Sequence, residues 1–289
     1  MDGGGKVDQI LTVEGPDVSL VHANHPKFRL SDGQKDFYEK NGYLLVEGVL
    51  SPEEVDRYKA RAREIILSGG PPGAGKTIVR DVRVAKGEYI PDDPEKGVWK
   101  LLQPDWYDDL FKAYPEHPKL LDVSETFIGE DIKAFLTMMI YKPPGVEADH
   151  PFHQDAFYFT FGPHDQILGT WVALDPTDED NGTLVVIPGS HKLNLINHDV
   201  PKADKVNFGV FGAEGFEGPH PDEVALRLQP GDGAFFHSRT LHRTGPNLTD
   251  RHRRVLTVHM ASAKCKPTGD VLPQLKFRLV RGQEYSGCI

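Results

Sequence analysis

The segment from His150 to Phe159, HPFHQDAFYF, holds a histidine and an aspartate at a spacing suited to metal chemistry. In an extended strand successive side chains alternate between the two faces, so His153 and Asp155 point to one side while Gln154 points to the other. A second imidazole from a distant strand would complete a two-histidine, one-carboxylate site, which holds non-haem Fe(II) and leaves coordination positions open. A lone His-x-Asp is also common among ordinary surface residues. The prediction therefore depends on finding the third ligand.

Two histidines near residue 240 are candidates for that ligand, His242 and His237. His242 follows a predicted strand and lies far along the chain from Asp155, as expected when ligands from opposite strands of a barrel meet. His237 stands five residues earlier, and so on the opposite face of a regular strand. We favour His242, with His237 as the alternative, because of a residue that follows it.

That residue is Arg253, eleven residues after His242. A turn at Gly245-Pro246-Asn247 separates the two, so we expect Arg253 on the antiparallel neighbouring strand, pointing into the same cavity. A guanidinium pairs with a carboxylate through two parallel hydrogen bonds, which lysine cannot reproduce. Iron and Arg253 together predict a keto-acid co-substrate that chelates the metal at one end and is held by the arginine at the other.

The composition predicts a globular protein with a small-molecule substrate. The 289 residues are 38% hydrophobic and 26% charged, so we expect a single domain over residues 28–289 after a flexible tail, residues 1–27. The net charge of -10 argues against nucleic-acid binding, and no apolar run is long enough to span a membrane. Cys265 and Cys288 are too few for a disulfide framework. Without a recognisable secretory signal, we expect an intracellular protein, by default a cytoplasmic one.

Helices are predicted mainly in the first half of the chain. Serines at two helix starts are suitable N-caps, and the second is followed by proline and two glutamates. The expected elements are a helix from Ser31 to about Asn41, a strand over residues 43–46, a helix from Ser51 to about Leu67, and one or two helices in residues 110–128, interrupted at Pro115 and Pro118.

From Ile132 onward short strands alternate with turns, which predicts a sandwich or barrel. The predicted class is α+β, mainly β, with a helical N-terminal half packed on a C-terminal β-barrel. Asn181-Gly182 is predicted as a tight hairpin turn, because both residues tolerate positive φ. The segment 191–222 lacks periodicity and is expected to act as a lid or binding loop, with a disordered insert as the alternative. The predicted strands are 134–141, 152–159, 167–174, 183–187, 224–228, 233–237 and 254–260.

Two other motifs have competing interpretations. Residues 70–77, GPPGAGKT, satisfy the phosphate-loop pattern G-x4-G-K-[ST]. That motif requires a strand before it and a helix after it, whereas here a predicted helix precedes and a β-like segment follows, so we interpret it as a connector. A group of arginines is either a patch for an anionic substrate or a solvated charged loop; its members are Arg239, Arg243, Arg251, Arg253 and Arg254.

Most of the chain, from about Phe37 to Arg281, resembles the phytanoyl-CoA dioxygenase family of Fe(II)- and 2-oxoglutarate-dependent oxygenases. Several motifs carry the resemblance together, and among them is His153-Gln154-Asp155 followed by Tyr158-Phe159. The others are VRDV (79–82), TMMIYKPP (137–144), NGTLVVIPGSHK (181–192), ASAKC (261–265) and FRLV (277–280).

The resemblance implies a double-stranded β-helix (jelly-roll, cupin-like) core. It implies the cofactors Fe(II) and 2-oxoglutarate, with ascorbate as a candidate addition. Members that halogenate have a small residue in place of the aspartate ligand, so the presence of Asp155 implies hydroxylation with O2, giving succinate and CO2. The implied site residues are His153, Asp155 and His242 as iron ligands, Arg253 on the C5 carboxylate of 2-oxoglutarate, and Lys100, Met138 and Trp171 lining its pocket.

The implied substrate is a branched or long-chain acyl-CoA, hydroxylated at its 2-position. Two alternatives stay open: the same chemistry on a small molecule without CoA, and a catalytically silent cupin-like binding protein. The resemblance allows a peroxisomal location, but we find neither a cleavable N-terminal address nor a C-terminal Ser-Lys-Leu, since the chain ends Ser286-Gly287-Cys288-Ile289.

Overall fold

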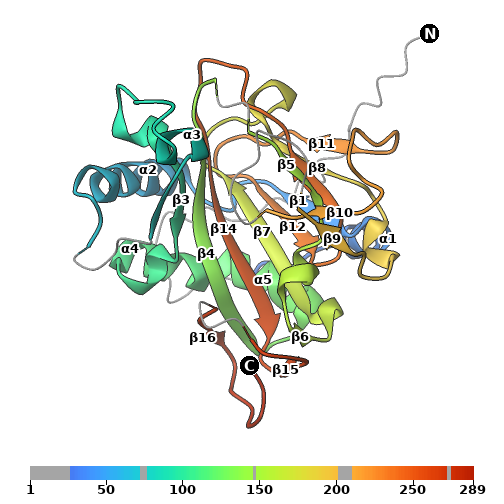
Figure 1. The fold of residues 1–289 in the computed structure, drawn as a ribbon. Helices are drawn as coiled ribbons and strands as arrows, with labels where there is room; N and C mark the ends of the chain where they lie inside the picture. The colour runs from blue at the N-terminus through green and yellow to red at the C-terminus, as the bar shows by residue number, and fades with distance from the viewer. Residues whose placement is uncertain (1–26, 72–76, 146–147, 201–209, 272–274) are drawn as a thin grey trace.

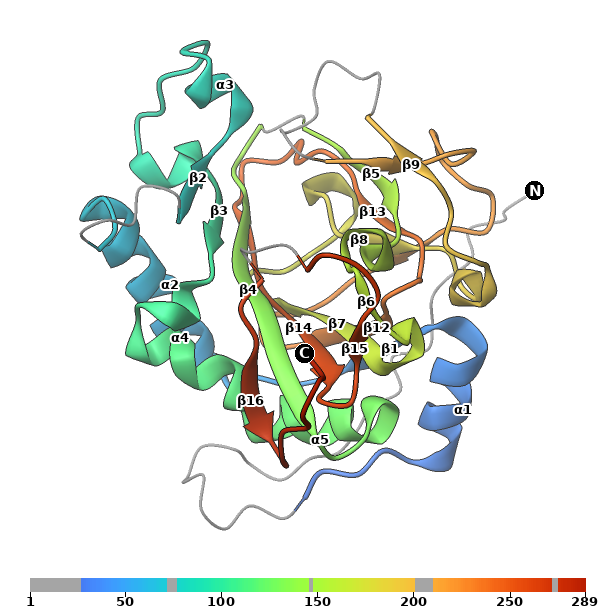
Figure 2. The ribbon, with the colours of Figure 1, turned by 60° about the horizontal axis from the view of Figure 1, so that its bottom comes forward.

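The computed structural model describes residues 27–71, 77–145, 148–200, 210–271 and 275–289. Within these ranges two antiparallel β-sheets face each other, and helices cover the outer face of the larger sheet (Figure 1; Figure 2). This arrangement confirms the predicted class, a mainly β jelly roll with flanking helices. The predicted tail lies outside the described residues except for its last residue, and the single domain over 28–289 stays a prediction.

The two sheets enclose an apolar interior. Trp171 of the larger sheet and Val186 of the smaller one belong to the same buried cluster. The larger sheet runs in the order β1 (Tyr43–Val46), β12 (Gly233–His237), β7 (Ile167–Ala173), β14 (Arg253–Ser262), β4 (Ile132–Lys142), β3 (Val98–Leu102) and β2 (Ile78–Arg80), with β16 (Arg278–Arg281) also paired to β4. The smaller sheet runs in the order β11 (Val224–Leu226), β8 (Leu184–Val186), β13 (His242–Thr244) and β5 (His150–His153).

The N-terminal half of the chain contributes strands as well as helices. β1 pairs with β12 at one edge of the larger sheet, and β3 and β2 extend the other edge beyond β4. The prediction of a helical half packed on a separate barrel was therefore wrong in this respect. These strands were too short, and β2 and β3 too irregular in pattern, to be assigned to a sheet from the sequence.

The predicted helices are confirmed, with their caps. The hydroxyls of Ser31 and Ser51 each accept a hydrogen bond from the backbone N–H three residues on, and the side-chain oxygens of Gln34 and Glu54 each accept one from the serine backbone N–H. The helices are α1 (Asp32–Asn41), α2 (Pro52–Leu67), α4 (Asp109–Ala113) and α5 (Pro118–Ile128), together with the unpredicted short α3 (Val82–Ala85). No helix in the described ranges is long and apolar enough to cross a membrane.

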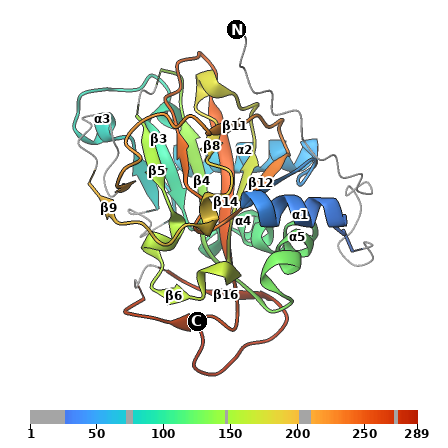
Figure 3. The same cartoon turned by 90° about the vertical axis from the view of Figure 1, so that its right-hand side faces the viewer.

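Side-chain alternation along β14 separates the helix layer from the interior. Leu256 and Val258 point outward into the large cluster that includes residues of α2 and α5, while Val255, Thr257 and His259 point the other way. α5 lies against β7, β14 and β4 (Figure 3). One strand thus carries both core residues for the helices and polar residues for the interior.

β4 contains a bulge beside this strand. Thr257 pairs with Met138, but His259 pairs with Phe135, so two residues of β4 stand opposite one residue of β14. Leu136, one of the two, has a φ of 52°, a left-handed conformation that is rare for leucine. The extra residue places Phe135 on the same side of the sheet as Met138.

One local prediction was wrong. Asn181-Gly182 does not form a two-residue hairpin, because Asp178 caps a 3-10 turn, Glu179–Asn181, and only Gly182 is left-handed. β7 and β8 consequently lie in different sheets. In the described part of the segment 191–222, β9 (His198–Asp199) pairs with β10 (Gly212–Ala213). The role of this segment as a lid or binding loop stays a prediction.

Gly169 of β7 tests the packing between the larger sheet and the interior. A methyl group there would lie 2.6 Å from the ring of Phe236 on β12, so we expect Gly169→Ala to lower the free energy of unfolding by about 1–3 kcal/mol through overpacking. Urea unfolding measures this. The control is Gly33→Ala in α1, which has open space around its Cα and should unfold at the same or a higher urea concentration. Equal loss in both variants would contradict the packing argument.

Candidate metal centre

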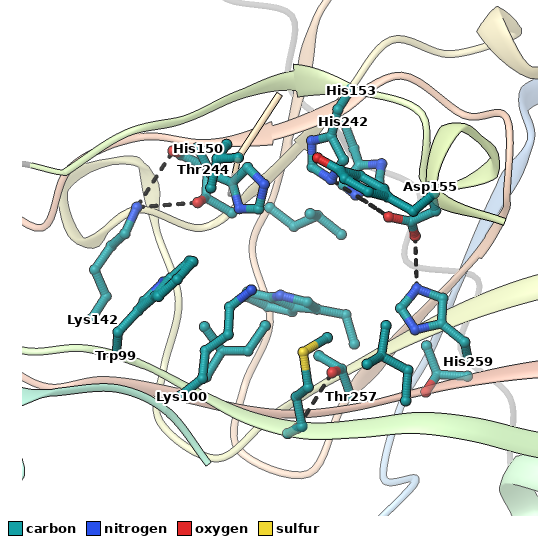
Figure 4. A pocket seen from close by; sticks show the side chains of 18 of the residues that line it. Trp99, Lys100, Lys142, His150, His153, Asp155, His242, Thr244, Thr257 and His259 are labelled. Carbon is teal, nitrogen blue, oxygen red and sulfur yellow. Dashed lines mark hydrogen bonds and ion pairs between the residues drawn. The ribbon is translucent and has the colours of Figure 1, made fainter. Parts of the chain in front are cut away.

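Three buried side chains point their donor atoms at one another between the two sheets (Figure 4). Oδ1 of Asp155 lies 3.5 Å from Nε2 of His153 and 3.7 Å from Nε2 of His242. One donor atom from each residue lies within 4.8 Å of the other two, and none of the three residues is more than 7% exposed. Two imidazoles and one carboxylate form the donor set of mononuclear non-haem Fe(II) sites. The structure therefore brings together the three side chains that the sequence suggested.

The pairing of β13 with β5 sets the two histidines in place. His242 lies opposite His153 in the register, and the centroids of the two rings are 4.1 Å apart. Nδ1 of His153 is 2.9 Å from the carbonyl of Pro151, and Nδ1 of His242 is 2.9 Å from that of Thr240. Because a carbonyl only accepts, each Nδ1 carries the hydrogen and each Nε2 presents its lone pair to the centre. Both rings are thus held in the tautomer that binds a metal.

Asp155 reaches the centre by a different route from the predicted strand 152–159. β5 ends at His153, and Asp155 begins a 3-10 turn, Asp155–Tyr158. Gln154 between them is still extended, with φ -110° and ψ 125°, so the alternation of faces holds through Asp155 before the chain turns. The spacing argument was correct, whereas the predicted length of the strand was not.

Gln154, on the other face, ties this segment to residues that follow β8. Its amide nitrogen donates to the carbonyl of Arg239 at 3.0 Å, and its amide oxygen accepts from the backbone of Ile196 at 2.8 Å. Its backbone N–H donates to Nε2 of His198 at 2.9 Å. The start of the segment 191–222 is therefore fastened directly to the residue between two of the three donors.

The protonation states suit metal binding. Burial and the neighbouring His153 lower the pKa of His242 to about 4, so this imidazole is neutral at pH 7. Burial alone would raise the pKa of Asp155, but the nearby His242 and His259, the latter also through a hydrogen bond from its Nε2, hold it well below its usual range. The carboxylate is thus ionised and the imidazole unprotonated, as coordination requires.

Arg253 is a buried cation with no carboxylate against it. It is 1% exposed, and its Nε and Nη1 have no hydrogen-bond partner among the described residues. Its guanidinium lies 5.4 Å from the ring centre of Trp171, and burial lowers its pKa to about 9. Buried polar atoms are rarely left unpaired. An arginine in this state fits a carboxylate brought by a ligand.

Arg253 reaches the cavity from the wall opposite His242. The prediction of antiparallel neighbouring strands was wrong, because β13 pairs with β5 and β8 in the smaller sheet while β14 pairs with β4 and β7 in the larger one. The turn after His242 carries the chain across the barrel. The two side chains still face one cavity, now across its width.

Lys100, Met138 and Trp171 line the same cavity, which has a volume of about 260 Å³ and is mostly apolar. Lys100 projects from β3, and its amine lies 4.1 Å from the ring centre of Trp99. Burial lowers the pKa of Lys100 to about 8, so a large fraction stays protonated at pH 7. All seven residues proposed from the sequence therefore meet in one cavity.

Known proteins are similar in sequence to most of this chain. A model of the phytanoyl-CoA dioxygenase (PhyH) family matches residues 38–255. The chain belongs to this family. The peroxisomal phytanoyl-CoA dioxygenase of Mus musculus is 36% identical over 237 residues, covering 81% of this chain and 69% of that protein. A probable alpha-ketoglutarate-dependent hypophosphite dioxygenase of Stutzerimonas stutzeri is 30% identical and covers 82% of this chain and 80% of that protein.

Solved structures share the fold of this PhyH protein. The epimerase SnoN in complex with Fe3+, alpha ketoglutarate and nogalamycin RO superposes with a TM-score of 0.65 at 24% identity, over 86% of this chain and 98% of that chain. Membership of the family confirms the predicted enzyme class, the 2-oxoglutarate-dependent dioxygenases, and the predicted cofactors, iron and 2-oxoglutarate. The addition of ascorbate stays a prediction.

The predicted arginine patch does not exist as a free basic surface. Arg254 pairs with Asp175 and Glu95, and each of the other three surface arginines has its own acid. These pairs are Arg251 with Asp178, Arg239 with Asp165 and Arg243 with Glu223. Only Arg253 among the five has no acidic partner within the described residues.

Sequence reasoning missed several polar residues of the cavity, among them His259 and Lys142. His259 lies six residues after Arg253 on the same strand, so period-two alternation from Arg253 would have found it. Lys142 ends β4, and its amine donates to Oγ1 of Thr244 at 3.1 Å and to the carbonyl of Gly245. Burial, and then the charge of Arg253, hold the pKa of Lys142 well below its usual value.

The choice of His242 over His237 has a direct test. Nδ1 of His237 accepts from the backbone of Arg239, so its Nε2 donates to Asp165, 3.1 Å away, and His237 is not among the residues that line the cavity. We therefore expect His242→Ala to weaken Mn(II) binding by more than about 100-fold, beyond the 10- to 100-fold typical of residues that only support a ligand. Calorimetric titration of the metal-free protein measures this. His237→Ala is the control and should bind Mn(II) like the parent; the reverse pattern would exchange their roles.

Proposed function

We propose that this protein uses Fe(II) and 2-oxoglutarate to hydroxylate an acyl-CoA at its 2-position. One observation supports the co-substrate most directly: the buried, unpaired Arg253 shares a cavity with a complete set of iron donors. The acyl-CoA is supported by the 36% identity to proteins named phytanoyl-CoA dioxygenase in several species. The aspartate donor supports hydroxylation over halogenation, as the family resemblance implied.

The residues have separable parts in this mechanism. His153, Asp155 and His242 would hold the iron, and their geometry leaves positions open for a bidentate keto acid and for O2. Arg253 would bind the far carboxylate of 2-oxoglutarate through its planar fork. When bound, these partners supply the oxidation of a C–H bond to C–OH, with succinate and CO2 as the other products.

The cavity wall would serve this chemistry by excluding water and orienting the bound 2-oxoglutarate. Met138 and Trp171 are buried and present apolar surface to the cavity, and the ring centre of Trp171 lies 5.4 Å from the guanidinium of Arg253. Surroundings of low polarity strengthen the interaction of that arginine with an anion. Lys100 adds a second positive charge on the same wall. A dianionic co-substrate therefore meets two cations in a site of low polarity.

A specific observation favours a second candidate, the same reaction on a small molecule without CoA. The phosphates of CoA need accessible basic residues, whereas four of the five arginines of the predicted patch are already paired with acids. The complete donor set and the family membership argue against the third alternative, a catalytically silent protein. An intracellular location, cytoplasmic or peroxisomal, stays a prediction.

Substrate choice is tested by coupled turnover. We expect purified protein with Fe(II), O2 and 2-oxoglutarate to form succinate together with 2-hydroxyacyl-CoA when offered a panel of branched and straight acyl-CoAs, and much less with the corresponding free acids. Mass spectrometry of both products measures the coupling. Turnover that is equal for free acids and thioesters would instead support the candidate without CoA.

The role of Arg253 is tested by a conservative change. Arg253→Lys should raise the 2-oxoglutarate concentration for half-maximal succinate formation by about 10- to 100-fold, since hydrogen bonds to charged groups contribute about 1.5–3 kcal/mol. Arg251→Lys, at a half-exposed arginine paired with Asp178, is the matched control and should leave that concentration unchanged. An unchanged value in Arg253→Lys would remove this residue from the co-substrate site.

A further inference from the structure

The two carboxylate oxygens of Asp155 have different surroundings. Oδ1 faces Nε2 of both His153 and His242, at 3.5 and 3.7 Å. Oδ2 points to the larger sheet, where Nε2 of His259 lies 2.9 Å away (Figure 4). Because an ionised carboxylate only accepts, His259 donates this hydrogen bond. One oxygen is thus directed at the metal centre and the other is bound by the protein.

His259 has no other polar contact among the described residues. It is 6% exposed, and its Nδ1 lacks a hydrogen-bond partner. The ring packs between Phe135, with centroids 5.6 Å apart, and Phe159, at 5.2 Å. A histidine that only filled the core would leave both nitrogens unsatisfied there, which is costly. The bond to Asp155 is therefore what accounts for a histidine at this position.

The hydrogen bond from His259 to Asp155 affects how many coordination positions of the metal stay open. Two histidines and one carboxylate oxygen leave room for the two oxygens of a keto acid and for O2. If both oxygens of Asp155 bound the metal, one of these positions would be lost. A donor that holds Oδ2 away from the metal keeps that position open.

We propose that His259 is a positioning residue that keeps Asp155 a one-oxygen ligand, so that 2-oxoglutarate and O2 can bind together. The proposal rests on the ligand roles given under Proposed function. It predicts that removing the donor weakens metal binding and, more specifically, changes how many ligands the metal has before and after 2-oxoglutarate is added.

The test uses the full-length protein loaded with Co(II), whose visible spectrum reports coordination number. His259→Phe keeps an aromatic ring among Phe135 and Phe159 but removes the donor. We expect it to bind Mn(II) about 10- to 100-fold more weakly, to show an altered Co(II) spectrum, and to bind 2-oxoglutarate to the Co(II) form more weakly. His259→Gln, whose amide N–H can reach the same oxygen, should restore the parent spectrum and most of the affinity.

A matched control separates this role from packing. The ring of Phe161 packs on Phe135, Phe159 and Phe277 in the same aromatic cluster but does not pair with the ring of His259. Phe161→Leu should lower thermal stability and leave the Co(II) spectrum and both affinities unchanged. If His259→Phe does not fold, His259→Leu takes its place.

Three outcomes would decide the matter. A parent-like Co(II) spectrum and parent-like affinities in His259→Phe would overturn the positioning role. Equal changes in Phe161→Leu, or no restoration in His259→Gln, would also overturn it and assign His259 to packing. Failure of the parent protein itself to bind Co(II) would instead overturn the proposed function, so the two failures are distinguishable.

Discussion

The antiparallel register of β13 against β5 is the constraint on which the metal centre depends. His242 faces His153 across this pair, and a slip of one residue would turn His242 to the other side of the sheet. Both strands are short, three and four residues, so their own ladder gives limited stability. The pairing of β13 with β8 and the hydrogen bond of Gln154 with Ile196 further stabilise the register of β13 against β5.

The interior of the barrel contains more basic than acidic buried side chains. Three basic side chains line one cavity, those of Arg253, Lys100 and Lys142. Within the described residues, Asp155 is the buried acid near the histidines. Unpaired buried cations are unfavourable, and the lowered pKa values of all three express that cost. The charges of such a wall are poorly compensated by the protein alone, and a small dianion such as the co-substrate proposed above would compensate them.

Much of the fold and site could be predicted because their signals are local. Ser51 followed by Pro52 determines a helix start, and the His-x-Asp spacing requires only an extended peptide at Gln154. What failed was non-local. Nothing in the sequence shows that the strand after His242 crosses to the other sheet, because that depends on the pairing of β14 with β4 and β7.

Asn181-Gly182 failed for a related reason, since the side chain of Asp178 competes with the hairpin by capping a 3-10 turn. The arginines near residue 250 were predicted as a group from their proximity in sequence. Their acids lie far away in the chain, as with Arg254 and Glu95. A sequence reveals charges more readily than it reveals which charges neutralise one another.

The bulge at Leu136 shifts the alternation of side chains along β4 by one residue. Toward its C-terminal end even-numbered residues such as Met138 face the cavity, while before the bulge Phe135, an odd-numbered residue, reaches the same side and packs on His259. Loss of one residue here would leave the cavity wall intact at one end and turn Phe135 outward at the other. One extra residue in β4 therefore links the lining of the cavity to the aromatic residues that hold His259 beside Asp155, and a relative without this bulge would need another way to hold its carboxylate.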